Sequence, residues 1–200
     1  MLKLGLFSIF TTAVALMSGC AAQYPPSTKS LLLAPLSVLS QQLDPYYLSP
    51  LWVDTIAFAA MQARTLLESG RITEAQMAEV VVKSRAAAKN NPKAQLSGDF
   101  TVEQLLAEPM YQNPLRLHDC CPISDGACAM IICTVEKAKE WAVPYALIKG
   151  IDHRIESHHI GLRDLSRLES VEISAKALNV NAKPVDVAEL YAPFSHQELM

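Results

Sequence analysis

Apolar residues between Ser49 and Gly70 recur at the spacing of an α-helix. The stripe consists of Trp52, Val53, Ile56, Ala60, Ala63 and Leu67. The Ser49-Pro50 pair is typical of a helix start, because serine caps a free N–H group and proline lacks the N–H that would stay unpaired there. Gly70 is typical of a helix end. The pattern therefore predicts one helix between these boundaries.

Two further helices are predicted by capping boxes, in which a threonine and a glutamine three residues later each bond to the other's backbone N–H. The box at residues 73–76 predicts a helix that ends before Pro92. The box at residues 101–104 predicts a short helix that ends before Pro109. Residues 44–110 are therefore expected to consist of helices and loops without strands.

The pattern changes after Pro114. Short unbroken apolar runs now appear, which is the pattern of strands that helices cover on both faces. Such runs alternate with helical patterns, and this alternation indicates an α/β fold. The predicted elements are a strand at 127–133, a helix at 134–142, a strand at 145–151, a helix at 162–179 ended by Asn179, a strand at 185–190, and a capping box at 195–198.

The first twenty residues permit two interpretations. One lysine, an apolar stretch and the sequence Ser18-Gly19-Cys20 are typical of a bacterial lipoprotein signal, with Cys20 as the lipid-modified residue. The same residues fit a buried helix that stops at Gly19. The stretch is short for a membrane span, so no stable membrane insertion is expected.

Charge and composition exclude some classes of function. The formal net charge is −3 and the chain has no basic run, whereas a nucleic-acid-binding face needs basic residues to replace the counterions on phosphates. Half of the residues are hydrophobic and only 18% are charged, so we expect a partner or further chain to cover part of the surface. The chain is therefore expected to be an oligomer or a fragment.

Four of the five cysteines lie in the sixteen residues from His118 to Cys133. Cys120 and Cys121 are adjacent and diverge in an extended chain, so they do not make a zinc-ligand pair. Cys128 and Cys133 are an odd number of residues apart on the predicted strand and also diverge. We therefore expect no metal, and buried small side chains are the favoured interpretation. A nucleophilic cysteine is the alternative, and it would need a lowered pKa.

Residues 188–198 (AELYAPFSHQE) are the best candidate for a site. Ligands of open α/β sheets bind at the carboxyl ends of strands, and a capped helix N-terminus beside them favours negative charge. Tyr191 could donate its hydroxyl to a developing oxyanion, and Phe194 could form an apolar wall for a substrate. The alternative is that both side chains pack against the end of the sheet.

The order of these segments resembles the thiolase superfamily, and within it the branch of sterol-carrier and lipid-transfer-protein thiolases. The resemblance covers roughly residues 44–200, and its most specific part is PISDGACA at 122–129. It rests on residues 78–109, 114–132, 144–150 and 185–199.

This resemblance implies a partial layered α/β fold of two similar halves, with a helical loop region before the strands. The implied divisions are a signal-like or vestigial N-terminal segment at 1–43, the helical loop region of the first half at 44–117, the end of that half at 118–150, and the start of the second half at 151–200.

The resemblance also implies cleavage or condensation of carbon–carbon bonds in acyl-CoA thioesters, with coenzyme A as a substrate and no other cofactor. In the family a cysteine thiolate takes the acyl group. That nucleophile corresponds to a segment before residue 1, and a second cysteine and a GHP element correspond to segments after Met200. We therefore expect the chain alone to be an inactive part of an acyltransferase, in the cytoplasm unless Cys20 carries a lipid anchor.

Tyr191 stands where family members carry the first residue of an NEAF, HDAF or HDCF motif, which helps to build an oxyanion hole through a water. Tyrosine there is similar to members that cleave carbon chains by retro-aldol chemistry, often with an OB-fold partner. The implied partners are therefore an acyl-CoA substrate and either a second copy of the chain or an OB-fold protein. A non-catalytic subunit that works with such a partner is the alternative.

Overall fold

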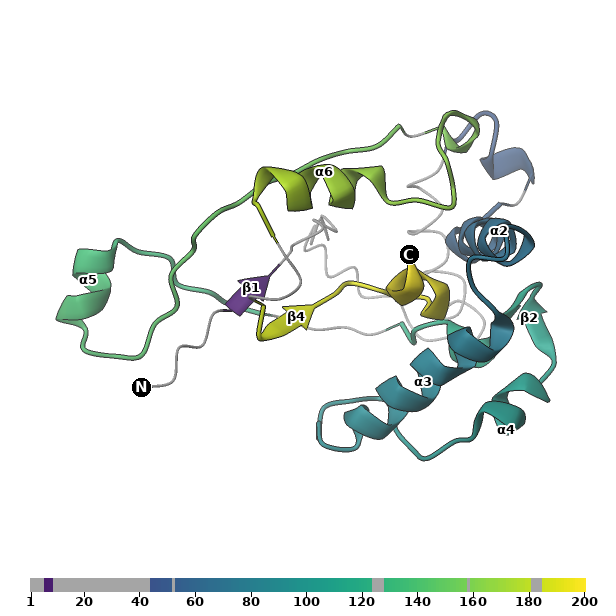
Figure 1. The fold of residues 1–200 in the computed structure, drawn as a ribbon, viewed down its shortest axis with the longest axis horizontal. Helices are drawn as coiled ribbons and strands as arrows, with labels where there is room; N and C mark the ends of the chain where they lie inside the picture. Colours follow the sequence, from purple (N-terminus) through teal and green to yellow (C-terminus); the bar gives the residue numbers. More distant parts are fainter. Residues whose placement is uncertain (1–5, 9–43, 52, 124–127, 158, 181–184) are drawn as a thin grey trace, which may run out of the picture. The chain divides into compact units, whose positions relative to one another are not determined.

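The computed structural model describes residues 6–8, 44–51, 53–123, 128–157, 159–180 and 185–200. Figure 1 shows these residues as a ribbon with the helices and strands labelled. They form two compact units, which are described separately. Within the described residues, unit 1 holds 6–8, 128–157, 159–163, 168–180 and 185–191, and unit 2 holds 44–51, 53–123, 164–167 and 192–200.

The helices of unit 2 begin at side chains that cap free N–H groups. Helices α3 (Glu74–Ala88) and α4 (Val102–Leu106) each begin with a complete capping box, on Thr73 and Thr101 respectively, as predicted. Helix α2 (Thr55–Glu68) ends beside Gly70, which has a φ of 70°. A positive φ is a conformation that glycine adopts without steric cost, and this explains why the helix stops there.

The predicted start of α2 at Ser49 is wrong. Ser49–Leu51 forms a separate 3₁₀ turn, η1, and α2 begins only after Asp54. The Oδ1 atom of Asp54 accepts a hydrogen bond from the N–H of Ala57 at 2.7 Å. Aspartate caps a helix about as well as serine. The cap at Asp54, rather than the serine predicted at position 49, therefore defines the first turn of α2.

The core of unit 2 lies between α2, α3 and the C-terminal residues. Leu66 and Met77 are among its largest fully buried side chains, and Phe194 packs against the same cluster. Small side chains on α2 let neighbouring segments approach closely. The buried members are Ala59, Ala60, Ala63, Leu66, Ile72, Met77 and Leu115, and a second cluster of Ala78, Val81 and Leu105 joins α3 to α4.

An antiparallel hairpin follows α4. Strand β2 (Met110–Gln112) pairs with β3 (Leu115–Arg116), and a 3₁₀ turn, η2 (Leu117–Asp119), comes next. The pattern of the sequence did not predict this hairpin, because the two strands are too short to show alternation. The strand-free stretch predicted at 44–110 is wrong at its last residue, because β2 begins at Met110, while the described residues from 44 to 109 contain no strand.

Unit 1 contains a two-stranded parallel sheet and two helices. Strand β1 (Leu6–Ser8) pairs with β4 (Val187–Glu189), which lies inside the predicted strand. Helix α5 (Val135–Glu140) agrees with the prediction. Helix α6 (Glu169–Ala177) begins later than predicted, after the 3₁₀ turn η3 (Ile160–Leu162), and the chain turns at Asn179, whose φ is 51°.

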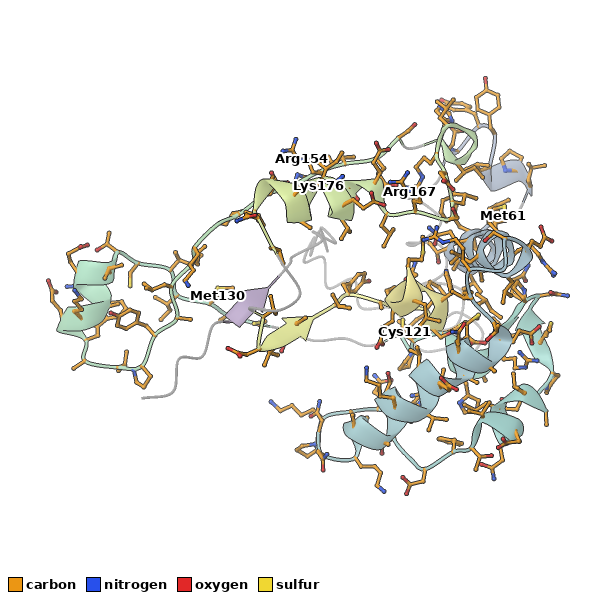
Figure 2. The ribbon with its side chains drawn as sticks, in the orientation of Figure 1. Met61, Cys121, Met130, Arg154, Arg167 and Lys176 are labelled. Carbon is orange, nitrogen blue, oxygen red and sulfur yellow. The ribbon has the colours of Figure 1, made fainter. Side chains whose placement is uncertain are left out.

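The predicted strands at 127–133 and 145–151 are not formed in the described residues. Residues 128–133 and 145–151 carry no regular secondary structure, and most of their apolar side chains are exposed, Ile131 by 80%. Met130, labelled in Figure 2, is exposed as well. A strand needs a neighbour to pair with its N–H and C=O groups, and none of the described segments supplies one to these runs. The expectation of buried cysteines is likewise wrong for Cys121, Cys128 and Cys133, since all three are exposed.

At the level of fold class, the described residues are a mixed α/β structure, as predicted. The capping box predicted at 195–198 is wrong, because Ser195–Leu199 is a 3₁₀ turn, η4, rather than the start of an α-helix. The predictions for Cys20 fall outside the described residues. Within the described residues, no helix combines the length and apolar character needed to cross a bilayer.

Candidate functional site

Unit 2 brings residues 119–121 beside residues 193–195. The N–H of Cys121 donates to the carbonyl oxygen of Pro193 at 2.9 Å. Cys120 and Phe194 form an isolated antiparallel bridge. The turn that follows Tyr191 is therefore joined to a segment more than seventy residues earlier in the chain.

Asp119 supplies a third link between these two segments. Its Oδ1 accepts a hydrogen bond from the Ser195 hydroxyl at 2.5 Å, and its Oδ2 accepts one from the N–H of Arg116 at 2.8 Å. Both Asp119 and Ser195 are buried. A buried carboxylate is costly unless hydrogen bonds satisfy it, so these two donors make the position of Asp119 tolerable.

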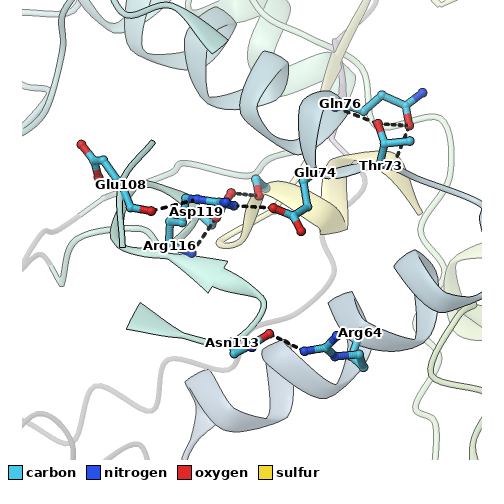
Figure 3. A network of polar contacts seen from close by, with 9 residues as sticks. Arg64, Thr73, Glu74, Gln76, Glu108, Asn113, Arg116 and Asp119 are labelled. Atoms are coloured by element: carbon cyan, nitrogen blue, oxygen red, sulfur yellow. Dashed lines mark hydrogen bonds and ion pairs between the residues drawn. The ribbon is translucent and has the colours of Figure 1, made fainter. Parts of the chain in front are cut away.

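Arg116 extends this network to α3 and to the residues before β2 (Figure 3). Its Nη1 lies 2.8 Å from Oε2 of Glu74, in the first turn of α3, and its Nε donates to the carbonyl oxygen of Glu108 at 3.2 Å. The Arg116 side chain is mostly buried, so this ion pair is screened less by water than an exposed one. The network thus connects Asp119 to helix α3 of unit 2.

His118 lies at the edge of the network. Its Nε2 is 2.9 Å from Oε1 of Glu108, and its ring centroid is 5.0 Å from that of Phe100. A hollow of about 10 Å³ lies nearby, lined by Glu74, Met77, Ala78, Val81, Leu105, Leu106, Arg116, His118 and Asp119. That volume suits about one water molecule and is too small for an acyl chain.

His196 follows Ser195 and is completely buried, with an exposure of 0%. Within the described part of the chain, neither of its ring nitrogens has a hydrogen-bond partner. Its ring centroid lies 6.0 Å from that of Phe194. Burial lowers the pKa of His196 to about 4, because the charged imidazolium is disfavoured away from water. The imidazole is therefore neutral at physiological pH.

The two site residues predicted from sequence have different surroundings. Tyr191 belongs to unit 1 and is 65% exposed. Phe194 belongs to unit 2 and is partly buried against its core. Sequence reasoning missed Asp119, Ser195 and His196, because only tertiary contact reveals that they meet or are buried.

Two of the cysteines have thiols that are hard to ionise. Burial, with the nearby charge of Asp119 as a further cause, raises the pKa of Cys120 to about 12. Cys121 is exposed as a residue, but the partial removal of its thiol from water also raises its pKa. Since the thiolate is the nucleophilic form, neither residue has the chemistry of an activated nucleophile. The described residues contain no cluster of three or more His, Cys, Asp or Glu side chains that could hold a metal ion.

Comparison with known proteins places these residues in context. No family model matches the chain. It is 36% identical to an acetyl-CoA acetyltransferase of Methanothermobacter thermautotrophicus over 145 residues, which are 69% of this chain and 37% of that protein. It is 29% identical to the benzoylsuccinyl-CoA thiolase subunit BbsB of Thauera aromatica over 153 residues, 74% of this chain and 40% of the relative.

A third relative has a different reaction in its name. The chain is 34% identical to a steroid side-chain-cleaving aldolase of Thermomonospora curvata over 106 residues, which are 52% of this chain and 27% of that protein. The chain therefore spans at most about two fifths of the length of these relatives.

Proposed function

Because the chain belongs to the thiolase superfamily, we propose that it forms part of an enzyme that cleaves or joins carbon–carbon bonds of acyl-CoA thioesters. The observation that carries this proposal is the 36% identity to an acetyl-CoA acetyltransferase over 69% of the chain. The layered α/β fold implied by the family is part of the proposal. Exposed apolar side chains such as Ile131 and Ile151 support it, since a further layer would cover them.

Tyr191 is the proposed catalytic residue of this segment. Its phenol would donate a hydrogen bond to the thioester oxygen as negative charge develops there, and Phe194 would contact the acyl group. A donor aimed at a developing oxyanion lowers the barrier, and the loss of one such donor typically costs about a hundredfold or more in rate. Tyr191 is exposed to solvent, so a ligand can reach its hydroxyl.

The nucleophile of this reaction is not Cys120 or Cys121, since the raised pKa values of both thiols oppose the thiolate form. Covalent transfer of an acyl group needs a thiolate, and electrostatic stabilisation by Tyr191 does not replace it. In the family resemblance none of the cysteines at 118–133, including the exposed Cys128 and Cys133, matches the nucleophile, so we predict that the 200-residue chain gives no detectable thiolysis of acetoacetyl-CoA. Turnover by the purified chain, measured as loss of the β-ketoacyl absorbance, would contradict this prediction.

A second candidate function is retro-aldol cleavage of a β-hydroxyacyl-CoA. It is favoured by the similarity to a steroid side-chain-cleaving aldolase and to a 17-hydroxy-3-oxo-4-pregnene-20-carboxyl-CoA lyase of Mycobacterium tuberculosis. In that reaction a base takes the β-hydroxyl proton, the carbon–carbon bond breaks to leave a carbonyl product, and the thioester enolate takes up a proton. A phenol such as that of Tyr191 could stabilise the enolate or move the proton.

The partners and the location of the whole protein belong to the same proposal. We expect an acyl-CoA substrate, no cofactor beyond coenzyme A as a substrate, and a cytoplasmic enzyme that works with a second copy of itself or with an OB-fold protein. A non-catalytic subunit and a lipid anchor at Cys20 are the alternatives. The mass of the protein purified from cells distinguishes the anchor, because lipid modification would remove residues 1–19 and add acyl chains.

The role of Tyr191 can be tested on this chain by fluorine NMR. The chain is labelled with 3-fluorotyrosine at its six tyrosines, and the Tyr191 signal is identified as the one missing from Tyr191→Phe. Acetoacetyl-CoA should shift this signal, whereas coenzyme A alone should not, because it lacks the acyl group. A larger shift with 3-hydroxybutyryl-CoA would favour the retro-aldol alternative. If no CoA thioester shifts the signal, the proposed role of Tyr191 is wrong.

A further inference from the structure

We propose that Asp119 and Ser195 are positioning residues, which lock the turn at 193–195 onto the 119–121 segment and thereby hold Tyr191 for its reaction. This inference deepens the proposed function and rests on it. Neither residue would touch the substrate. Their hydrogen bond joins residues 76 positions apart, so it sets the tertiary position of the turn rather than its local conformation.

Three contacts make the lock. The Ser195 hydroxyl donates to Oδ1 of Asp119 at 2.5 Å, the N–H of Cys121 donates to the Pro193 carbonyl oxygen at 2.9 Å, and Cys120 forms a bridge with Phe194. The Cys120–Phe194 and Cys121–Pro193 contacts are between backbone groups. The Ser195–Asp119 contact is the charge-assisted one and is buried, so it contributes the most per bond.

Further contacts hold the Asp119 end of the lock. Oδ2 of Asp119 accepts the N–H of Arg116, whose guanidinium pairs with Glu74 at the start of α3. The Asp119 carboxylate is therefore held by Arg116 independently of its hydrogen bond to Ser195. Removal of the Ser195 hydroxyl would leave Oδ1 buried without its donor, which favours any opening that lets water reach it.

Only a short stretch of chain separates Tyr191 from the lock. Tyr191 is two residues before Pro193, so its α-carbon lies within about 7 Å of the anchored one. The ring of Pro193 fixes its own φ and restricts the backbone of Ala192. Few backbone dihedrals therefore remain free between the lock and the phenol. An ordered lock limits the positions that Tyr191 can take. A residue that donates a hydrogen bond to one substrate oxygen needs such a limited position.

The test compares three serine variants without ligand. Ser195→Ala removes the donor, Ser195→Thr keeps a hydroxyl at the same place, and Ser166→Ala removes a hydroxyl of unit 2 that bonds to Asp164 and Arg71 instead. We measure hydrogen exchange of the Cys121 amide and the fluorine signal of 3-fluorotyrosine at position 191. Far-ultraviolet circular dichroism reports whether each variant is folded.

We expect Ser195→Ala to speed exchange of the Cys121 amide by about tenfold to a hundredfold, as the loss of a hydrogen bond to a buried charge predicts. The Tyr191 signal should move toward that of an unfolded chain. Ser195→Thr should restore both values, and Ser166→Ala should leave both unchanged. Should Ser195→Ala fail to fold, Asp119→Asn, whose amide keeps one accepting oxygen, should show the same changes in smaller measure.

The inference is overturned if Ser195→Ala, or Asp119→Asn in its place, leaves both signals at their wild-type values. It is also overturned if threonine fails to rescue them, since the hydroxyl would then not be the cause. These ligand-free signals test the lock alone, and the response of Tyr191 to acetoacetyl-CoA tests the proposed function. If the ligand-free signals change with the Ser195 hydroxyl but acetoacetyl-CoA does not shift the Tyr191 signal, the lock is retained and the proposed function of Tyr191 is rejected.

Discussion

Protonation of His196 should destabilise unit 2 in mild acid. The imidazole is fully buried, and neither ring nitrogen has a partner within the described residues. Its pKa in the folded protein is about 4, against an ordinary value of 6.5. Between these two values the unfolded chain binds the proton more readily than the folded one. Stability is therefore fully present above the ordinary pKa and falls as the pH drops toward the folded pKa.

The size of the effect follows from the two pKa values. Each unit of difference is about 1.4 kcal/mol, so the complete loss is about 3 kcal/mol, of which about 2 kcal/mol is lost between pH 7 and pH 5. The variant His196→Gln fills the site with a side chain that does not titrate. Carboxylates contribute their own acid dependence to both proteins, and the comparison of the two removes that shared part.

The assay is urea unfolding of both proteins at a series of pH values, followed by far-ultraviolet circular dichroism. The wild-type chain should lose about 2 kcal/mol more than His196→Gln between about pH 7 and pH 5. Equal losses in the two proteins would mean that His196 has access to water or to a partner, and the argument from its burial would be wrong. A smaller free energy of unfolding for His196→Gln at pH 7 does not affect this test. The test depends only on how much the free energy of unfolding of each protein changes with pH.

Three further predictions concern the packing and the chemistry of the described residues. Leu66→Ala, at a fully buried site in the core, should lower the free energy of unfolding by about 2–5 kcal/mol, and a loss below about 1 kcal/mol would contradict the described core. Asp54→Ala should cost about 1 kcal/mol through the loss of the α2 cap, while Asp54→Ser should cost less. In timed labelling with a thiol reagent at mildly alkaline pH, Cys128 and Cys133 should react well before Cys120, because its pKa is raised to about 12. Equal rates measured by mass spectrometry would refute that order.

The candidate site could be predicted only in part. The stretch around Tyr191 and Phe194 was identified because a loop at the carboxyl end of a predicted strand, beside a predicted helix start, is a common place for ligands. The residues that hold this turn could not be found in the same way. Ser195 has the spacing of a capping box with Glu198, yet its hydroxyl bonds to Asp119 instead. A local pattern gives no sign of such competition between a nearby and a distant partner.

The sequence by itself determined the features that depend on neighbours a few residues away: the capping boxes at Thr73 and Thr101, and the chain reversals at Gly70 and Asn179. Such features need only backbone geometry and side chains that reach one turn along the chain. Tertiary structure alone decided the β2–β3 hairpin, the burial of His196 and the lack of pairing at 128–133. The physical reason is that strands and buried polar groups are stable only when distant residues supply their hydrogen bonds and exclude water, and a local pattern does not specify those distant partners.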